Sequence, residues 1–459
     1  MAASYHILYD AVMAERYDVI VVGGGVTGAG VARDCAMRGL RTVLLERGKP
    51  GMATTVSSTH LIHGGLRYLL YDRLTTHTTC WDSGHIIRIA APLLHRLPIL
   101  WPVYRGHDHG LETVETLLEV YDYFTHMKGG KTHLRLSPEE TLKLVPGLKA
   151  EGLLGAVAFD EWWIDPIALV ESNLESARRH GAEIRAGVGV TGLLRSIGRV
   201  DGVIADDREI RAPITINAAG PWVDRVARMA GARIPLRLQK GTHLQYKEKL
   251  VPVGLLLEAE GGGRYVFVVP SPQGTLVGPT DLAAPEDPDL VATTDDEVSY
   301  LLKSVKRYFP AFPERYDATT IGARPILGQA GSEKLLSREF EVFDHGKRDG
   351  LEGLLTIGGG KMSDFRVMAE AVTNLACLKL GQPHACPTYR ETLDGKPVGE
   401  IPSFPKPAPA LKRFLRRHPR LRELHALGYL GAAFAGHAAR RLTHTDGLAT
   451  ADQLRAYYK

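Results

Sequence analysis

The chain has 459 residues, 44% of them hydrophobic and 24% charged, with a formal net charge of +4. This length exceeds one ordinary hydrophobic core, so we expect two or three domains of a globular protein, and the mild charge gives no reason to expect nucleic acid as a partner. The four cysteines, Cys35, Cys80, Cys377 and Cys386, show no C-x-x-C or metal-ligand spacing. We therefore expect free thiols, and neither disulfides nor a metal site.

Residues 1–16 lack the basic start and the apolar core of a secretory signal. No apolar stretch of the sequence reaches the ~20 residues that a membrane-spanning helix needs. We therefore expect a cytoplasmic protein, or one held peripherally on the inner face of the membrane.

The first clear structural unit is a nucleotide-binding pattern. An apolar strand over 17–22 runs into GGGVTG at 23–28, and a helix of small residues follows over 29–38. A second strand, 41–45, ends on Glu46. A G-x-G-x-x-G motif alone is weak evidence, but strand, glycines, helix, second strand and terminal acid together predict a dinucleotide site.

Each glycine of this motif has a mechanical reason. We expect Gly23 to permit the tight turn, Gly25 to let the backbone approach a pyrophosphate, and Gly28 to let the helix pack on the strand. The pyrophosphate then lies at the helix amino end, where free N–H groups and the positive end of the helix dipole favour an anion. Glu46 stands where a carboxylate accepts hydrogen bonds from a ribose.

Hydrophobic spacing predicts the later elements in chain order. The predicted helices cover 74–97, 109–127, 165–180, 223–229, 295–308 and 363–380. The predicted strands cover 155–159, 182–185, 189–195, 200–204, 214–220, 242–247, 253–258, 264–269, 275–279 and 353–357. The strands within 242–279 form the pattern of one antiparallel sheet, whereas 353–380 returns to the dinucleotide-binding style. The binding domain is therefore predicted to be discontinuous, with an antiparallel domain inserted.

The composition changes after residue 381. A proline-rich linker at 402–409 precedes a basic region whose apolar residues, between 411 and 424, fit one face of a helix. Such a helix can lie on an anionic membrane surface. The alternative is a basic helix that packs on the rest of the protein or mediates oligomerisation.

Eight motifs occur in an order that resembles the FAD-dependent glycerol-3-phosphate dehydrogenase family, a group of DAO-type flavoproteins. They are GGGVTGAG at 23–30 with ARDCA at 32–36, SSTHLIHGGLRYL at 57–69, NAAGPW at 217–222, KGTH at 240–243, GPTD at 278–281, GARP at 322–325 and GGGK at 358–361. The resemblance covers roughly 17–380. DHGKRDGLEG at 344–353 is most similar to the flavin subunit of the anaerobic bacterial enzyme, although this chain lacks the cysteine-rich carboxyl-terminal segment of that subunit.

The resemblance implies an α/β fold. It implies a glutathione-reductase-like Rossmann domain that binds FAD without a covalent link, an inserted antiparallel β-sheet substrate domain, and a short helical tail. The expected FAD-binding domain is 1–95, 150–235 and 320–385, the substrate domain is 96–149 and 236–319, and the linker with the basic helical region is 386–459.

The resemblance also implies roles for particular residues. The expected catalytic residues are His63, His243, Arg324 and Lys361, and the expected substrate ligands are Arg67, Tyr68, Arg324 and Lys361. The expected cofactor contacts are Gly23, Gly25, Val26, Thr27, Gly28, Glu46, Arg47, Thr54, Ser57, Ser58, His60, Gly64, Val190, Ala219, Gly220, Trp222, Gly359, Gly360, Lys361 and Met362. No metal ligand is expected.

Two questions stay open at this point. His63 and His243 compete for the role of general base, because an imidazole titrates near the working pH. After GGGK the family usually has leucine, two threonines, tyrosine and arginine, whereas this chain has MSDFR at 362–366. Asp364 either pairs with Arg366 or disfavours a doubly charged substrate.

The leading functional hypothesis is oxidation of sn-glycerol 3-phosphate, a small phosphorylated polyol, to dihydroxyacetone phosphate by hydride transfer to FAD. Electrons then pass to quinone or to an acceptor protein. One alternative is a related flavin oxidoreductase that acts on an amine or a hydroxy acid. Another is a flavoprotein without turnover that serves as a scaffold subunit.

Overall fold

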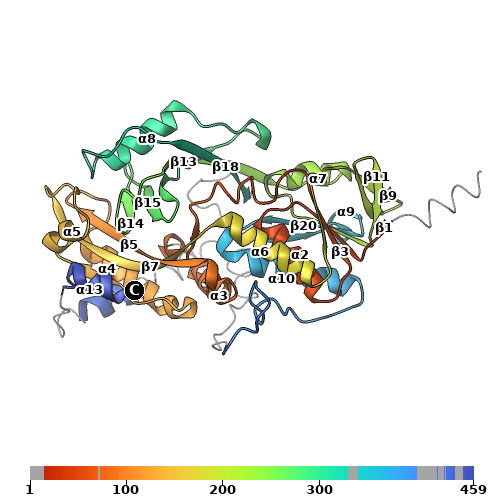
Figure 1. Cartoon of the computed structure of the whole chain (residues 1–459), viewed down its shortest axis with the longest axis horizontal. Helices are drawn as coiled ribbons and strands as arrows, with labels where there is room; N and C mark the ends of the chain where they lie inside the picture. The colour runs from red at the N-terminus through yellow and green to blue at the C-terminus, as the bar shows by residue number, and fades with distance from the viewer. Residues whose placement is uncertain are drawn as a thin grey trace, which may run out of the picture.

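The computed structural model describes the chain apart from a few segments. The described residues are 15–70, 73–328, 340–400, 421, 428, 431–439 and 448–459. Within them three sheets form: six strands beside the nucleotide-binding motif, four strands that cover one face of these six, and ten strands that form the other half of the molecule. Figure 1 shows the ten-stranded sheet on the left and the six-stranded sheet on the right.

The six-stranded sheet is parallel except at one edge. Its order is β19 (Phe340–Asp344), β20 (Leu354–Gly359), β12 (Ile214–Asn217), β2 (Val19–Val22), β3 (Thr42–Glu46) and β8 (Glu183–Ala186), and only β19 runs antiparallel to its neighbour. Strands of a parallel sheet are covered on both faces, so they consist of uninterrupted apolar residues. Val19–Val22 are accordingly all buried.

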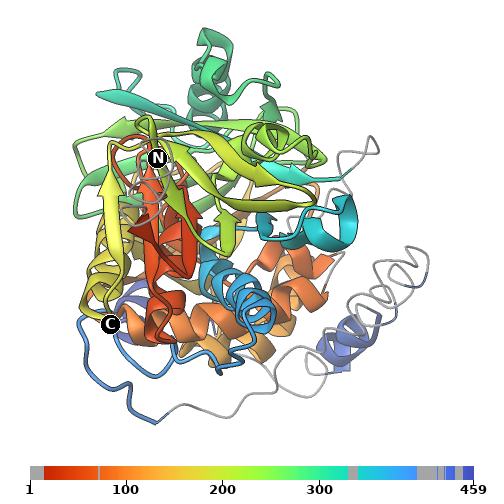
Figure 2. The ribbon, with the colours of Figure 1, turned by 90° about the vertical axis from the view of Figure 1, so that its right-hand side faces the viewer.

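Alternate residues of β2 face two different cores. Val19 and Val21 contribute to the core against the helices, whereas Ile20 and Val22 contribute to the core on the opposite face. The helices are α2 (Val26–Met37), α6 (Pro166–Arg179) and α10 (Phe365–Lys379). The opposite face is covered by β1 (Glu15–Arg16), β11 (Arg208–Arg211), β10 (Arg199–Ala205), β9 (Val190–Ser196) and α7 (Val223–Met229). Figure 2 shows this end of the molecule.

The ten-stranded sheet is the larger of the two main sheets. Its strands are β4 (Leu61–Ile62), β5 (Leu94–Tyr104), β6 (Leu134–Leu136), β7 (Leu153–Ile164), β13 (Leu236–Tyr246), β14 (Gly254–Glu258), β15 (Tyr265–Ser271), β16 (Gly274–Gly278), β17 (Leu282–Ala283) and β18 (Ala318–Leu327). The strands predicted within 242–279 do share this sheet, and their mutual pairings are antiparallel. The sheet as a whole is mixed, because β14 runs parallel to β5.

Helices cover both faces of the larger sheet. Ala156 and Ala158 of β7 contribute to the core beside α5 (Pro138–Leu144), α8 (Asp295–Lys306) and α13 (Ala451–Tyr457). Val157 and Phe159 contribute to the core beside α3 (Arg73–Ile89) and α4 (Leu111–Thr125). The helices predicted over 109–127, 165–180 and 295–308 are therefore confirmed as α4, α6 and α8.

The structure corrects one of the predicted helices. The helix predicted over 74–97 ends at Ile89, because 94–104 forms β5 and pairs along its length with β7. Pairing between strands that are distant in the sequence, which a local pattern cannot reveal, makes 94–104 a strand. The strand β7 and most of β18 fall inside segments predicted for the FAD-binding domain, and both pair within the ten-stranded sheet. The bounds of the two domains stay a prediction.

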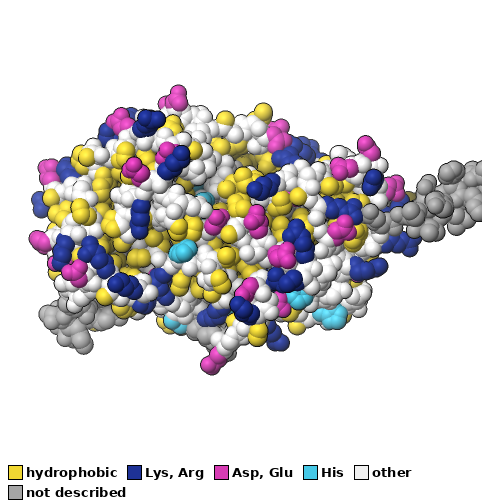
Figure 3. Space-filling model, viewed as in Figure 1, with side chains coloured by type: hydrophobic (Ala, Val, Ile, Leu, Met, Phe, Trp, Pro, Cys, Tyr) yellow, Lys and Arg dark blue, Asp and Glu magenta, His cyan; other side chains and the backbone are white. Residues whose placement is uncertain are grey.

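Figure 3 shows cationic and anionic side chains interspersed over one face of the molecule. The basic stretch 411–420, with most of 421–430, lies outside the described residues. Among the helices that are described, none combines the length and the apolar character needed to cross a bilayer.

Residues 431–439 are held against α4, and His437 bonds two of its glutamates. His437 bonds Glu119 through Nδ1 at 2.8 Å and Glu112 through Nε2 at 3.1 Å, and Arg135 of β6 pairs with Glu112 at 2.7 Å. Burial alone would lower the pKa of His437, but the hydrogen bonds to Glu119 and Glu112 outweigh it, and the pKa is raised.

We expect this docking to weaken as the pH rises. The pKa of His437 is higher when the segment is docked than when it is free. Protonated His437 therefore stabilises the docked segment fully below the ordinary histidine pKa of about 6.5, and this stabilisation is lost as the pH rises through the raised pKa. Glu115 adds negative charge to the cluster, and Arg135 offsets part of it. Hydrogen exchange in 431–439, corrected for intrinsic rates, should increase as the pH rises above about 6.5. In His437→Gln the exchange should be independent of pH, and equal pH dependence in both proteins would contradict the assignment.

Candidate functional site

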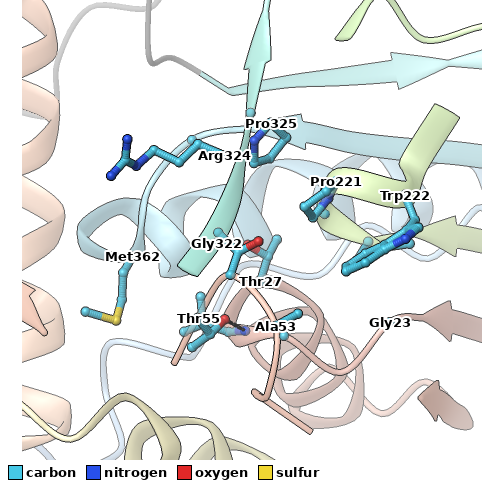
Figure 4. A pocket seen from close by; sticks show the side chains of 18 of the residues that line it. Gly23, Thr27, Ala53, Thr55, Pro221, Trp222, Gly322, Arg324, Pro325 and Met362 are labelled. Carbon is cyan, nitrogen blue, oxygen red and sulfur yellow. Dashed lines mark hydrogen bonds between the residues drawn. The ribbon is translucent and has the colours of Figure 1, made fainter. Parts of the chain in front are cut away.

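A cavity of about 400 Å³ lies at the carboxyl ends of β2, β3 and β12, where the two halves of the molecule meet. The glycine-rich turn, Arg47, Trp222, the loop 53–59 and β18 all contribute to its wall. Figure 4 shows Trp222 and Gly23 towards one end of this cavity, and Arg324 and Met362 towards the other. This is the edge of an open α/β sheet at which ligands bind.

The glycine-rich turn has the geometry that the motif predicts. Gly23 has φ +106°, and a Cβ there would lie 2.8 Å from the carbonyl oxygen of Ala218. A Cβ on Gly28 would lie 1.9 Å from the carbonyl oxygen of Gly23, so the helix packs on the strand only because residue 28 has no side chain. The turn therefore brings the start of α2 to the cavity wall.

The amino end of α2 is open to a ligand. Its N-cap residue, Gly25, provides no capping side chain, and there is no acidic residue in the first turn. Thr55 Oγ1 accepts the N–H of Val26 at 3.2 Å. A Cβ on Gly25 would have only Thr55 Oγ1 near it, at 3.4 Å, so the backbone is accessible from the cavity. Unpaired N–H groups and the helix dipole favour a phosphate at this position.

Glu46 is fixed beside this turn. Its Oε2 accepts the N–H of Gly24 at 2.6 Å, and its Oε1 accepts the N–H of Gly48 at 2.8 Å. A carboxylate has about four acceptor positions, so two remain for ribose hydroxyls. The Glu46 side chain is among those that line the cavity, as the motif predicts.

Arg47 and Trp222 form the far end of the cavity. The guanidinium of Arg47 lies 4.2 Å from the ring centroid of Trp222, whose Nε1 donates to Asp289 at 2.9 Å. Asp289 also pairs with Arg47 at 3.0 Å and with Arg225 at 2.6 Å. The hydrogen bond from Arg47, followed by those from Arg225 and Trp222, lowers the pKa of Asp289 to about 2 against the opposing effect of burial. The loop that carries Asp289 therefore ties the inserted segment to the nucleotide-binding half.

The opposite end contains two of the three cations expected to bind substrate, Lys361 and Arg324. Lys361 forms an ion pair with Asp364 and lies 5.0 Å from the centre of the Tyr68 ring. Arg324 Nη1 donates to Asp281 Oδ1 at 3.2 Å and to the carbonyl of Thr280 at 3.2 Å. Both cations line the cavity, and each has a carboxylate partner.

The expected alternative of an Asp364–Arg366 pair is wrong. Arg366 is buried, and it pairs with Asp82 of α3 at 2.7 Å and with Glu370 at 2.9 Å. Asp364 lies three residues after Lys361 in a 3₁₀ turn over Met362–Asp364, which brings its carboxylate back to the lysine. The charge of Asp364 is therefore placed beside a proposed phosphate ligand.

The structure distinguishes the two candidate histidines by position. His63 lines the cavity, whereas His243 is fully buried behind Thr59, whose Oγ1 lies 3.1 Å from His243 Nε2. Burial, reinforced by the positive charges of Arg324 and His60, holds the pKa of His243 well below its usual range. His243 is therefore neutral, and its Nε2 contacts the cavity wall through Thr59.

Most of the predicted site residues line this one cavity. These are His63, Arg324, Lys361, Gly23, Gly25, Val26, Thr27, Glu46, Arg47, Thr54, Ser57, Ser58, Val190, Ala219, Gly220, Trp222, Gly359, Gly360 and Met362. Those that do not line it are Gly28, His60, Gly64, Tyr68 and His243. Arg67 lies in the 3₁₀ turn Leu66–Leu70, and its side chain lies outside the described part of the chain.

Several lining residues were not predicted. Thr55 and Thr59 lie in the same hydroxyl-rich loop as the predicted serines, and Arg225 follows Trp222 by one helical turn. Pro325 flanks Arg324, and Ser363 follows Met362. Proximity to the predicted motifs could have indicated these five residues.

These observations together fit a dinucleotide. The open helix amino end, the glycines that allow close approach of the backbone, the fixed carboxylate of Glu46 and the hydroxyl groups of 54–59 lie along one continuous cavity. A pyrophosphate, a ribose and an extended polar chain each have suitable partners there.

Comparisons with known proteins agree with this geometry. The sequence model of the family described as FAD dependent oxidoreductase matches residues 18–362. The chain is 31% identical over 411 residues to the aerobic glycerol-3-phosphate dehydrogenase of Staphylococcus haemolyticus, covering 85% of this chain and 73% of that protein.

Solved structures show the same fold. The glycerol-3-phosphate dehydrogenase of Bacillus halodurans, complexed with FAD, has a TM-score of 0.65 at 23% identity and covers 99% of this chain and 84% of that one. Glycine oxidase from Geobacillus kaustophilus has a TM-score of 0.60 at 19% identity, covering 79% and 95% respectively.

Proposed function

The chain belongs to the family of FAD dependent oxidoreductases, and from that premise we propose that it oxidises sn-glycerol 3-phosphate to dihydroxyacetone phosphate. The observation that supports this substrate is the placement of two cations, Arg324 and Lys361, with one histidine, His63, around the same cavity that holds the nucleotide-binding turn. The name of the Staphylococcus relative supports the same substrate.

Each of these side chains has a distinct task in the proposed reaction. Arg324 and Lys361 bind the phosphate, the arginine through its planar fork of N–H donors. His63 takes the proton from the C2 hydroxyl, as a neutral imidazole can near neutral pH. His243 holds Thr59 at the cavity wall. Bound FAD supplies the acceptor for the hydride from C2.

The test of this proposal is anaerobic reduction of the bound flavin. Addition of sn-glycerol 3-phosphate to the purified holoprotein should abolish the visible absorbance of oxidised flavin at millimolar substrate or below. Glycerol and inorganic phosphate serve as controls, because each provides only part of the substrate. A flavin that stays oxidised with sn-glycerol 3-phosphate but is reduced by an amine or a hydroxy acid would contradict the proposal.

We propose that the electrons leave to quinone or to an acceptor protein, with the enzyme peripheral on the inner face of the membrane. The basic composition of 411–422 supports contact with anionic lipid. Co-sedimentation with anionic vesicles tests the membrane contact when the full chain is compared with a variant that has glutamine at the six lysine and arginine positions of 411–422, which leaves the core helix α13 in place. Reduction of a short-chain quinone analogue in steady state tests the acceptor.

One observation favours a second candidate function. Lys361 pairs with Asp364, and Arg324 pairs with Asp281, which Arg264 also contacts, so the two carboxylates offset part of the charge of the two cations. A pocket with less net positive charge suits a singly charged carboxylate better than a phosphate dianion. The second candidate is therefore oxidation of an amino acid or a hydroxy acid. The similarity of 344–353 to the flavin subunit of the anaerobic enzyme is a separate prediction.

Removal of the Asp364 charge should improve binding of sn-glycerol 3-phosphate. Asp364 is buried, and in Asp364→Asn it no longer offsets the positive charge of Lys361. At an effective dielectric constant of about 20 this is worth about 1–2 kcal/mol, or roughly fivefold to thirtyfold in KM. The KM for sn-glycerol 3-phosphate should fall, while turnover of uncharged glycerol should not change. An unchanged or raised KM for sn-glycerol 3-phosphate would show that Asp364 does not weaken phosphate binding. That result would remove the main argument for the second candidate function.

A further inference from the structure

A buried ion pair lies behind the cavity wall beside His63. Glu161 of β7 and Lys128 are 3% and 1% exposed, and Lys128 Nζ lies 2.5 Å from Glu161 Oε2. Tyr121, which is also buried, donates to Glu161 Oε1 at 2.5 Å. None of these three side chains lines the cavity, so they do not contact its contents.

The backbone of His63 and Gly64 is bonded to this pair and to its neighbours. Both oxygens of Glu161 lie within reach of the Gly64 N–H, at 3.4 and 3.3 Å, and Cys80 Sγ donates to the Gly64 carbonyl at 3.4 Å. The N–H of His63 donates to Ser363 Oγ at 3.0 Å, and Ser83 Oγ donates to the His63 carbonyl at 2.9 Å. All four backbone polar groups of these two residues therefore have side-chain partners.

The contact between Gly64 and the pair is close. A Cβ at position 64 would lie 2.2 Å from Tyr121 Oη and 2.4 Å from Cys80 Sγ. Only glycine lets the backbone approach the tyrosine and the carboxylate to hydrogen-bond distance. The Gly64 that the sequence motif singled out thus faces this buried pair, and not the cavity.

Stability alone is a weak reason for such a pair. A buried ion pair is costly to desolvate, and replacement by apolar residues of similar volume is often neutral. Here the pair is fully bonded, because Lys128 donates to Tyr121 Oη at 3.2 Å, to the Asp160 carbonyl at 2.6 Å and to Glu161. A satisfied network of this kind holds its groups in one geometry, so it provides a fixed acceptor at the Gly64 N–H.

We propose that Glu161, held by Lys128 and Tyr121, is a positioning residue that fixes the His63–Gly64 segment at the cavity wall. The inference rests on the proposed role of His63 as the base in polyol oxidation. Glu161 touches neither the cavity nor its contents, so it acts on the reaction only through the backbone of Gly64. A base that is displaced by about 1 Å from a productive position costs up to roughly 10²-fold in rate.

The first variant is Glu161→Asp. It keeps a carboxylate against Lys128 but shortens the side chain by one methylene, so the carboxylate withdraws from the Gly64 N–H. The matched control is Asp160→Asn. Asp160 is the adjacent buried carboxylate of β7 and forms an ion pair with Arg96, but it accepts the N–H of Lys131 at 2.9 Å and does not contact Gly64.

The first measurement needs no substrate. Hydrogen exchange in a peptide that covers 62–66 of the holoprotein should rise roughly tenfold in Glu161→Asp, as expected when one hydrogen bond to a charged group is lost. In Asp160→Asn it should match the wild type. If wild-type flavin is not reduced by sn-glycerol 3-phosphate, the proposed function fails, but this exchange measurement still decides whether Glu161 holds the segment.

The second measurement is the rate of anaerobic flavin reduction. Glu161→Asp should lower the limiting rate roughly tenfold to a hundredfold, while the Kd for sn-glycerol 3-phosphate and the FAD content match those of Asp160→Asn. The double variant Glu161→Gln/Lys128→Met restores an acceptor of full length without buried charge, and it should recover most of the rate. Unchanged exchange, an unchanged reduction rate, or an equal loss of rate in Asp160→Asn would each overturn the proposal.

Discussion

Arg324→Met is expected to lower kcat/KM for sn-glycerol 3-phosphate by roughly 10² to 10⁴-fold, with most of the loss in substrate binding. A hydrogen bond to a charged group contributes about 1.5–3 kcal/mol, and an arginine can make two of them to one phosphate. Methionine keeps most of the volume beside Gly241, where a Cβ would lie 1.9 Å from the Arg324 guanidinium. The loss therefore reports the charge and the hydrogen bonds more than a change in packing.

The control for this variant is another arginine that contacts the same carboxylate. Arg264 pairs with Asp281 at 3.3 Å, as Arg324 does at 3.2 Å, but Arg264 does not line the cavity. Arg264→Met should leave the KM within about twofold of the wild-type value, since this is the size of effect expected for a partly exposed ion pair. Stopped-flow reduction of the flavin gives both the limiting rate and the substrate Kd. A substrate Kd unaffected in Arg324→Met would exclude Arg324 as the phosphate ligand.

The nucleotide-binding part of the fold was predictable because its determinants are local. The conformation of Gly23 and the close packing of Gly28 are properties of single positions, and the apolar runs of β2 and β3 follow from burial on both faces. The N-cap of α6 is equally local, since Asp165 Oδ1 accepts the N–H groups of Ile167 and Ala168. Such features are visible in a window of a few residues.

The errors arose where distant segments decide the outcome. Leu94 and Leu97 have the spacing of one helix face, but their segment pairs with β7, which lies some sixty residues later in the chain. Arg366 is only two residues from Asp364, yet it bonds Asp82 of α3. The sequence offers both Arg366 and Lys361 as neighbours of Asp364, and the packing of α10 on α3 selects Lys361 as its partner.

The site shows the same division. Gly23, Gly25 and Glu46 were predicted as nucleotide contacts from spacing alone, and all three line the cavity, whereas Gly28 packs against the Gly23 carbonyl. The choice between His63 and His243 depends on which side of Thr59 each ring lies, and no local pattern contains that information. Likewise, the hydrogen-bond partners of Gly64 come from α3 and β7, and Glu161 of β7 lies 97 positions after Gly64 in the chain.

The largest loss of FAD affinity is expected from substitutions in the glycine-rich turn. Two of these substitutions, Gly25→Ala and Gly28→Ala, distinguish an effect on FAD binding from an effect on the stability of the apoprotein. Gly25 has an extended backbone, with φ −69° and ψ 178°, that alanine adopts freely, and the added Cβ would have only Thr55 Oγ1 within 4 Å, at 3.4 Å. Gly25→Ala should therefore fold with an apoprotein stability within about 1 kcal/mol of the wild type. Its FAD affinity should fall roughly tenfold to a hundredfold, because the methyl group lies where the phosphates would approach the backbone N–H groups of α2. Hydrogen bonds from those N–H groups to the charged phosphates would then be lost or lengthened.

Gly28→Ala should behave differently, because its Cβ would lie 1.9 Å from the Gly23 carbonyl oxygen and 3.6 Å from the Ala218 side chain. Relief of that overlap must separate α2 from β2, which costs about 1–3 kcal/mol in a packed interior. The apoprotein should therefore unfold at a lower temperature, and it should also bind FAD more weakly. Thermal unfolding of the two apoproteins, with titration of FAD by fluorescence quenching, measures both quantities. If Gly25→Ala bound FAD as tightly as the wild type, the phosphates would not lie at the amino end of α2, and the cavity would hold the cofactor in another orientation.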